Sequence, residues 1–176
     1  MTLERRLTEV EENAILQALD TAQIAGESVC RQAVRDCVLI RRTPLLAEIC
    51  DLRSGVAYAA LKTRASGITL GNQIFIRREF FADDGDIPLD LLAHEVAHVV
   101  QFLRDGTVPF LWRYLRDYTL GLTRGLGDRN AYMAIPYEVE ARRVADVLDL
   151  PATGLHTPDV QPTDVQSSDV HPTRSE

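Results

Sequence analysis

Two histidines and a glutamate interrupt the otherwise apolar stretch LDLLAHEVAHVVQF, residues 89–102. His94 and His98 are four residues apart, so on a helix they project from the same face, one turn apart. Two imidazoles placed in this way can both bind one zinc ion, at roughly 2.0–2.1 Å each. Glu95 lies beside the first ligand, where its carboxylate can accept a proton from a metal-bound water. This HExxH pattern is typical of zinc metallohydrolases.

The alternative interpretation is a pair of core histidines with satisfied hydrogen bonds. The setting of the pattern in the middle of an expected helix, with apolar flanks and a preceding hairpin, favours the metal site. A catalytic zinc also needs a third protein ligand and an open position. In the HExxHxxGxxH pattern the third ligand is a histidine, but Gln101 and Arg104 occupy the glycine and histidine positions here. His156 and His171 fall in a polar tail and are poor candidates.

The remaining source of a third ligand is a carboxylate in the later segment PYEVEARRVAD, which offers Glu138 and Glu140. On a helix, Glu138 shares a face with small residues such as Ala141 and Ala145, which would allow close approach to the HExxH helix. Glu140 shares its side with Tyr137, Val144 and Val147, a pattern typical of ordinary packing. We favour Glu138 over Glu140. The alternative interpretation is that both glutamates are exposed in the first turn of a helix, where the helix dipole favours negative charge.

Peptide hydrolysis also needs a hydrogen-bond donor for the oxyanion of the transition state. Tyr132, just before the glutamate-bearing segment, is our first candidate. Tyr137, Arg124 and Arg129 are further candidates, and each of these residue types is more often a packing or surface residue.

Composition limits the classes of protein that remain. The chain has 176 residues and a formal net charge of −7, which fits one domain with a sizeable core and argues against a nucleic-acid partner. No apolar run approaches the ~18 residues of a membrane span, and no signal peptide is visible. Cys30, Cys37 and Cys50 lack metal-like spacing and are expected as buried thiols. We therefore expect a soluble protein, cytoplasmic as synthesised.

The hydrophobic pattern predicts an α+β, mostly helical fold. We expect helices over residues 3–25, 27–39, 51–65, 88–104, 108–122 and 136–150. A β-hairpin is expected in ITLGNQIFIRREFF around Gly71-Asn72, followed by a turn at ADDGD, and a loop is expected at 123–130. The strand QIFI could pair with an extended peptide or lie inside the sheet. Beyond Pro151, Asp-Val repeats every five residues with Pro, Ser and Thr between, a composition typical of disorder.

Three segments, ITLGNQIFI, LLAHEVAHVVQF and AYMAIPYEVEARR, resemble a metallopeptidase domain of unknown function. That domain recurs in bacterial polymorphic-toxin proteins and in extracellular contractile injection clusters, and it belongs with the gluzincins. The resemblance covers about residues 50–148 and implies a zincin-like fold with His94, His98 and Glu138 as zinc ligands and Glu95 as the base. Many gluzincins carry an aspartate that supports a ligand histidine, but Arg142 stands at that position here. The support must then come from elsewhere.

The sequence thus predicts an N-terminal helical segment (1–49), a zincin-like metallopeptidase domain (50–150) and a disordered tail (151–176). The function we expect is a zinc-dependent metalloendopeptidase acting on a peptide or protein substrate. The resemblance also implies toxin-related or injection-system partners and is compatible with export by a non-classical route. The competing hypothesis is a non-catalytic zinc-binding module used for assembly or recognition. The intact Glu95 favours the enzyme, since a module that only binds metal has no need of the base.

Overall fold

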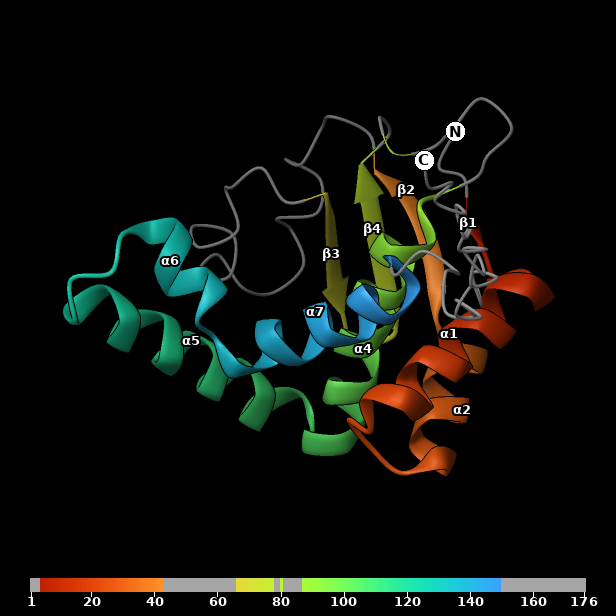
Figure 1. Cartoon of the computed structure of the whole chain (residues 1–176), viewed down its shortest axis with the longest axis horizontal. Helices are drawn as coiled ribbons and strands as arrows, with labels where there is room; N and C mark the ends of the chain where they lie inside the picture. The colour runs from red at the N-terminus through yellow and green to blue at the C-terminus, as the bar shows by residue number, and fades with distance from the viewer. Residues whose placement is uncertain (1–3, 43–65, 78–79, 81–86, 150–176) are drawn as a thin grey trace, which may run out of the picture.

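The computed structural model describes residues 4–42, 66–77, 80 and 87–149. Within these ranges most residues are helical, and a small four-stranded mixed sheet completes the fold (Figure 1). The predicted α+β, mostly helical class is confirmed. No helix in the described part of the chain is long and apolar enough to cross a membrane.

The sheet consists of β1 (Glu4–Arg5), β2 (Val38–Arg42), β3 (Gly67–Leu70) and β4 (Gln73–Arg77), in the order β1-β2-β4-β3. β2 and β4 are parallel, while β1 with β2 and β3 with β4 are antiparallel. The predicted hairpin is confirmed as β3 and β4, joined at Gly71, whose φ of +63° suits glycine. The strand QIFI lies inside the sheet, and β3 forms the edge in the described part of the chain.

The first predicted helix begins later than expected. Helix α1 spans Glu9–Ala22 and is preceded by β1 at Glu4–Arg5, so the prediction of a helix over residues 3–25 is wrong at residues 4–8 and 23–25. The reason is a capping box: the Thr8 side chain accepts from the Glu11 backbone N–H, and the Glu11 carboxylate accepts from the Thr8 backbone N–H. This cap fixes the start of the helix and leaves Glu4–Arg5 extended beside β2.

The second predicted helix also ends earlier than expected. Helix α2 spans Glu27–Asp36, and Cys37 is already extended, with φ −68° and ψ 146°. Residues 38 and 39, predicted as helical, belong to β2, where Leu39 pairs with Ile74 of β4. The parallel pairing with β4 supplies backbone hydrogen bonds that a helical continuation would forgo, and the apolar, partly β-branched run Val38–Ile40 suits a buried strand.

The C-terminal half of the described chain is helical. It contains α4 (Leu89–Asp105), α5 (Thr107–Thr123), α6 (Asp128–Met133) and α7 (Pro136–Asp149). The predictions for α4, α5 and α7 are confirmed within one or two residues. The prediction of a loop over residues 123–130 is wrong for residues 128–130, because α6 begins at Asp128, with Gly127 as its N-cap residue.

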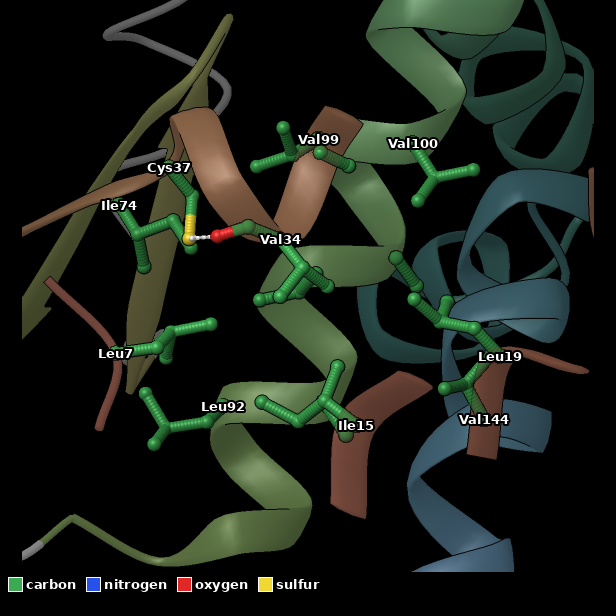
Figure 2. Packing of buried hydrophobic residues seen from close by; sticks show 14 of the residues in the cluster. Leu7, Ile15, Leu19, Val34, Cys37, Ile74, Leu92, Val99, Val100 and Val144 are labelled. Carbon is green, nitrogen blue, oxygen red and sulfur yellow. Dashed lines mark hydrogen bonds between the residues drawn. The ribbon is translucent and has the colours of Figure 1, made fainter. Parts of the chain in front are cut away.

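Helix α4 lies at the centre of the core and packs against β3, α1, α2 and α7. Figure 2 shows how residues far apart in the sequence meet along it. They include Ile15 and Leu19 of α1, Ile74 of β4, Leu92 and Val99 of α4, and Val144 of α7, all fully buried. Residues 4–42 therefore share one core with the HExxH helix and α7.

Some predictions fall outside the described residues: the helix at 51–65, the turn at 82–86, Cys50 and the tail after Pro151. Cys30 and Cys37 are buried free thiols, as expected.

Candidate metal centre

The two histidines of the HExxH pattern lie side by side on α4. Their ring centroids are 4.9 Å apart with the planes nearly perpendicular. His94 is partly buried, with its side chain 18% exposed, and His98 is more deeply buried, at 9%. The apolar residues that flank them on α4 are buried, and both rings are largely shielded from bulk solvent.

Glu138 reaches both histidines from the first turn of α7. Its oxygens lie 3.3 Å from His94 Nε2 and 3.4 Å from His98 Nε2. Ligand atoms at about 2.0–2.1 Å from a tetrahedral zinc are about 3.3–3.4 Å apart, so these separations suit a shared cation. One ligand atom from each of the three residues lies within 4.8 Å of the others. The cluster can therefore hold a metal ion once the three side chains close on it.

The electrostatics of the cluster also favour a cation. Burial raises the pKa of Glu138, but the adjacent His94 and His98 outweigh it and hold that pKa well below its usual range. Burial lowers the pKa of His98, yet contact with the Glu138 carboxylate outweighs burial and raises this pKa to about 9. Glu138 Oε2 is buried, and among the described residues its polar neighbour is His94 Nε2, 3.3 Å away, in a contact that does not satisfy hydrogen-bond geometry. A buried carboxylate that faces two imidazoles in this way fits a divalent metal that replaces the histidine proton.

Glu95 projects from α4 toward the edge strand β3. Its side chain is buried, and the Thr69 hydroxyl donates a hydrogen bond of 2.6 Å to Glu95 Oε2. Gly67 lies against the same carboxylate, and a Cβ added to it would sit 2.7 Å from Glu95 Cδ. The alternation of a strand places residues 67 and 69 on one face, which is the only sequence signal for these contacts. Our sequence reasoning did not identify either residue.

Two tyrosines approach Glu138 from outside α4. The Tyr114 hydroxyl, on α5, donates a hydrogen bond of 2.7 Å to Glu138 Oε1. Burial and the nearby Glu138 carboxylate raise the pKa of Tyr114 and of Tyr132, which lies on α6, so both phenols stay protonated. Tyr132, our sequence-based candidate, is therefore close to the cluster. Tyr114 was missed, although its spacing from Phe110 and Tyr118 places the three rings on one helical face.

The structure separates the two candidate glutamates. Glu138 is 2% exposed and lies at the histidines, whereas Glu140 accepts hydrogen bonds from Gln101 and Arg104, further along α4. Tyr137 directs its hydroxyl to Asp105 rather than to the cluster. Arg142, at the position of the gluzincin aspartate, donates to the Met133 carbonyl.

The loop arginines are not brought to the cluster either. Arg124 and Arg129 are both exposed. His156 and His171 lie outside the described residues.

A family model described as the eCIS core domain matches residues 51–106. The matched range contains β3, β4 and α4, with His94, Glu95 and His98, but it ends before Glu138. The match links this chain to proteins of extracellular contractile injection systems. No curated protein and no solved structure matches the chain significantly.

Proposed function

We propose that the chain is a zinc-dependent peptidase whose metal is held by His94, His98 and Glu138. The observation that carries the proposal is the convergence of Glu138 on both Nε2 atoms, at 3.3 and 3.4 Å, from a helix more than 30 residues away. Three protein ligands leave a fourth position for water or substrate, as catalytic zinc sites require. Two histidines and one carboxylate are also a typical donor set for zinc in hydrolases.

Each residue of the cluster has a defined task in this proposal. Bound zinc would lower the pKa of a coordinated water and polarise the scissile carbonyl. Glu95 would accept the proton of that water and pass it to the leaving amine. The hydrogen bond from Thr69 keeps the Glu95 carboxylate in one orientation. Tyr132 is the proposed donor to the oxyanion, because its phenol lies close to Glu138 and is kept protonated by burial and by that carboxylate.

The sheet supports a peptide as the substrate class. β3 is the edge strand in the described part of the chain, and its residues Gly67 and Thr69 contact Glu95. An extended peptide that pairs with β3 as a further strand would run past the proposed base, with its main chain bound by strand hydrogen bonds. The link to contractile injection systems makes a protein of such a system a reasonable substrate or partner.

The second candidate function is a non-catalytic metal-binding module. It is favoured by the environment of Glu95, a residue that is 4% exposed and whose carboxylate accepts a hydrogen bond from Thr69, and by the hydrogen bond from Tyr114 to Glu138. In that case the metal would join α4 to α7 and stabilise a surface for assembly.

Glu95→Gln separates the two functions. A peptidase variant should retain zinc, because residue 95 is not a ligand, but should lose cleavage by about 10²–10⁴-fold, because an amide cannot accept the proton. The measurements are zinc content of the purified chain and cleavage of a mixed peptide library. His94→Ala is the matched variant and should lose the metal itself.

If the Glu95→Gln variant cleaved peptides at the wild-type rate, Glu95 would be excluded as the base. Purified wild-type chain without metal, and unable to take up added zinc, would exclude the metal centre. Full zinc occupancy with no cleavage of any peptide would favour the binding module.

A further inference from the structure

A buried glutamine lies behind one of the proposed ligands. Gln101 is one helical turn after His98 on α4, and its side chain is completely buried. Its Oε1 lies 2.8 Å from His98 Nδ1, the ring nitrogen that points away from Glu138. A fully buried amide is costly unless all its polar atoms are paired, so its presence at this position calls for an explanation.

The other side of the amide fixes its orientation. Gln101 Nε2 lies 2.9 Å from the Tyr137 carbonyl oxygen and 3.0 Å from Glu140 Oε2. Both of these atoms can only accept hydrogen bonds, so the group that faces them must be the NH₂. The oxygen of the amide therefore faces His98, and Nδ1 of His98 must be the donor. A neutral His98 then has its lone pair on Nε2, which faces Glu138.

Glu140 is itself held in place. Arg104 donates to Glu140 Oε2 at 3.2 Å, and the same nitrogen of Arg104 lies 2.7 Å from the Ile24 carbonyl oxygen. A continuous chain of hydrogen bonds thus runs from Arg104 through Glu140 and Gln101 to His98. It joins α4 to α7, the two helices that carry the three proposed ligands.

We propose that Gln101 is the positioning residue of the metal centre, which holds the His98 ring with Nδ1 protonated and Nε2 free to bind the cation. This role rests on the proposed metal centre. Gln101 would also supply the histidine support that is missing at position 142. Arg142 stands where many gluzincins have the supporting aspartate, and it donates to the Met133 carbonyl instead. Groups that orient ligand histidines through Nδ1 typically change metal affinity about 10–100-fold when they are removed.

The test is Gln101→Met in the full chain, because methionine has a similar volume and no comparable acceptor. We expect its zinc affinity, measured by competition with a chelator, to fall about 10–100-fold. The zinc-loaded wild type should show a downfield, slowly exchanging Nδ1–H proton of His98 in its NMR spectrum, and the variant should lose it. Gln17→Met, at an exposed position of α1, is the matched control and should change neither quantity.

If Gln101→Met fails to fold, Glu140→Ala tests the same chain of hydrogen bonds at a side chain that is only 29% exposed but lies nearer the surface than Gln101. It should weaken zinc binding, while Glu140→Gln, which keeps an acceptor for the Gln101 NH₂, should restore most of the affinity. Unchanged zinc affinity with a retained Nδ1–H signal in folded Gln101→Met would overturn the role of Gln101 alone. A wild-type chain that binds no zinc would instead overturn the metal centre on which it rests.

Discussion

Glu95 and Gly67 are in such close contact that residue 67 has no room for a side chain. A Cβ at this position would lie 2.7 Å from Glu95 Cδ, well inside normal contact. Gly67→Ala should therefore displace the Glu95 carboxylate and weaken its hydrogen bond with Thr69. We expect a loss of about 1–3 kcal/mol in the free energy of unfolding, typical of overpacking. Any peptidase activity should also fall, because the proposed base is displaced. Bound zinc should be retained, because Glu95 is not one of the proposed ligands.

The matched control for this prediction is Gly127→Ala, because nothing lies within 4 Å of a Cβ added there. Gly127 is the N-cap residue of α6, so its replacement should cost less than about 1 kcal/mol. Both variants are measured by chemical denaturation and by zinc content. Equal stabilities of the two variants would contradict the close contact between Gly67 and Glu95.

The paired charges of His98 and Glu138 predict a pH dependence of the metal-free protein. The folded-state pKa of His98, about 9, exceeds its ordinary value of 6.5. Its contribution to stability is thus fully present below pH 6.5 and is lost as the pH rises through 9. The pKa of Glu138 is lowered, so its contribution is present above 4.5, its ordinary value, and is lost as the pH falls through the folded-state pKa.

Chelator-treated protein should therefore show a falling Tm between pH 6.5 and 9. The His98→Ala variant should be less stable overall, but its Tm should no longer fall between pH 6.5 and 9 through this residue. Zinc binding should tighten over the same range, because the metal competes with the His98 proton. A wild-type Tm that stays level or rises from pH 6.5 to 9 in the presence of chelator would contradict the coupling.

At the scale of elements, α4 and α7 were the parts that the sequence predicted best. Both have strong helical periodicity and clear ends, with Pro88 and Gly106 flanking α4 and Pro136 opening α7. The face pattern of α7 also favoured Glu138, which the structure brings to the histidines. Local patterns of spacing and small residues suffice for such predictions, because they depend on one helix at a time.

The elements that were missed depend on tertiary partners. β1 has two residues and exists only through its pairing with β2. β2 follows a helical pattern directly and is recognisable only once β4 is available to pair with it. The same holds at the site: Thr69 and Tyr114 gain their roles from contacts across 26 and 24 residues of sequence, which no local pattern contains. Gln101 is only three residues from His98, but its amide is oriented by the Tyr137 carbonyl, 36 residues further on.

At the scale of the whole molecule, the core extends well beyond the range that matches the eCIS core domain. The matched range, 51–106, includes α4 and the hairpin but lacks α1, α2, β2 and α7. All of these elements bury side chains against α4 or β4, as Figure 2 shows for Ile15, Val34 and Val144. The third proposed ligand also lies outside the match. The metal centre therefore depends on a fold assembled from both ends of the described chain.

Two truncations test this dependence on the N-terminal elements. Removing residues 1–42 would delete Ile15, Leu19 and Leu39, which are almost fully buried. Truncating one such side chain costs about 2–5 kcal/mol. Losing all three would cost about as much free energy as a typical domain has in total, about 5–15 kcal/mol. The shortened chain should therefore lose cooperative unfolding and zinc binding together.

Removing residues 151–176 is the matched truncation, since the polar Asp-Val repeats offer little apolar surface to bury. We expect the Tm of this shortened chain to stay within a few degrees of the wild type and its zinc affinity to be unchanged, because every proposed ligand and every core residue named above remains. Calorimetry and chelator competition on both truncations check the pair. A cooperative, zinc-binding 43–176 fragment would show that the N-terminal elements are dispensable, and a large drop in Tm without 151–176 would show that the tail packs on the domain.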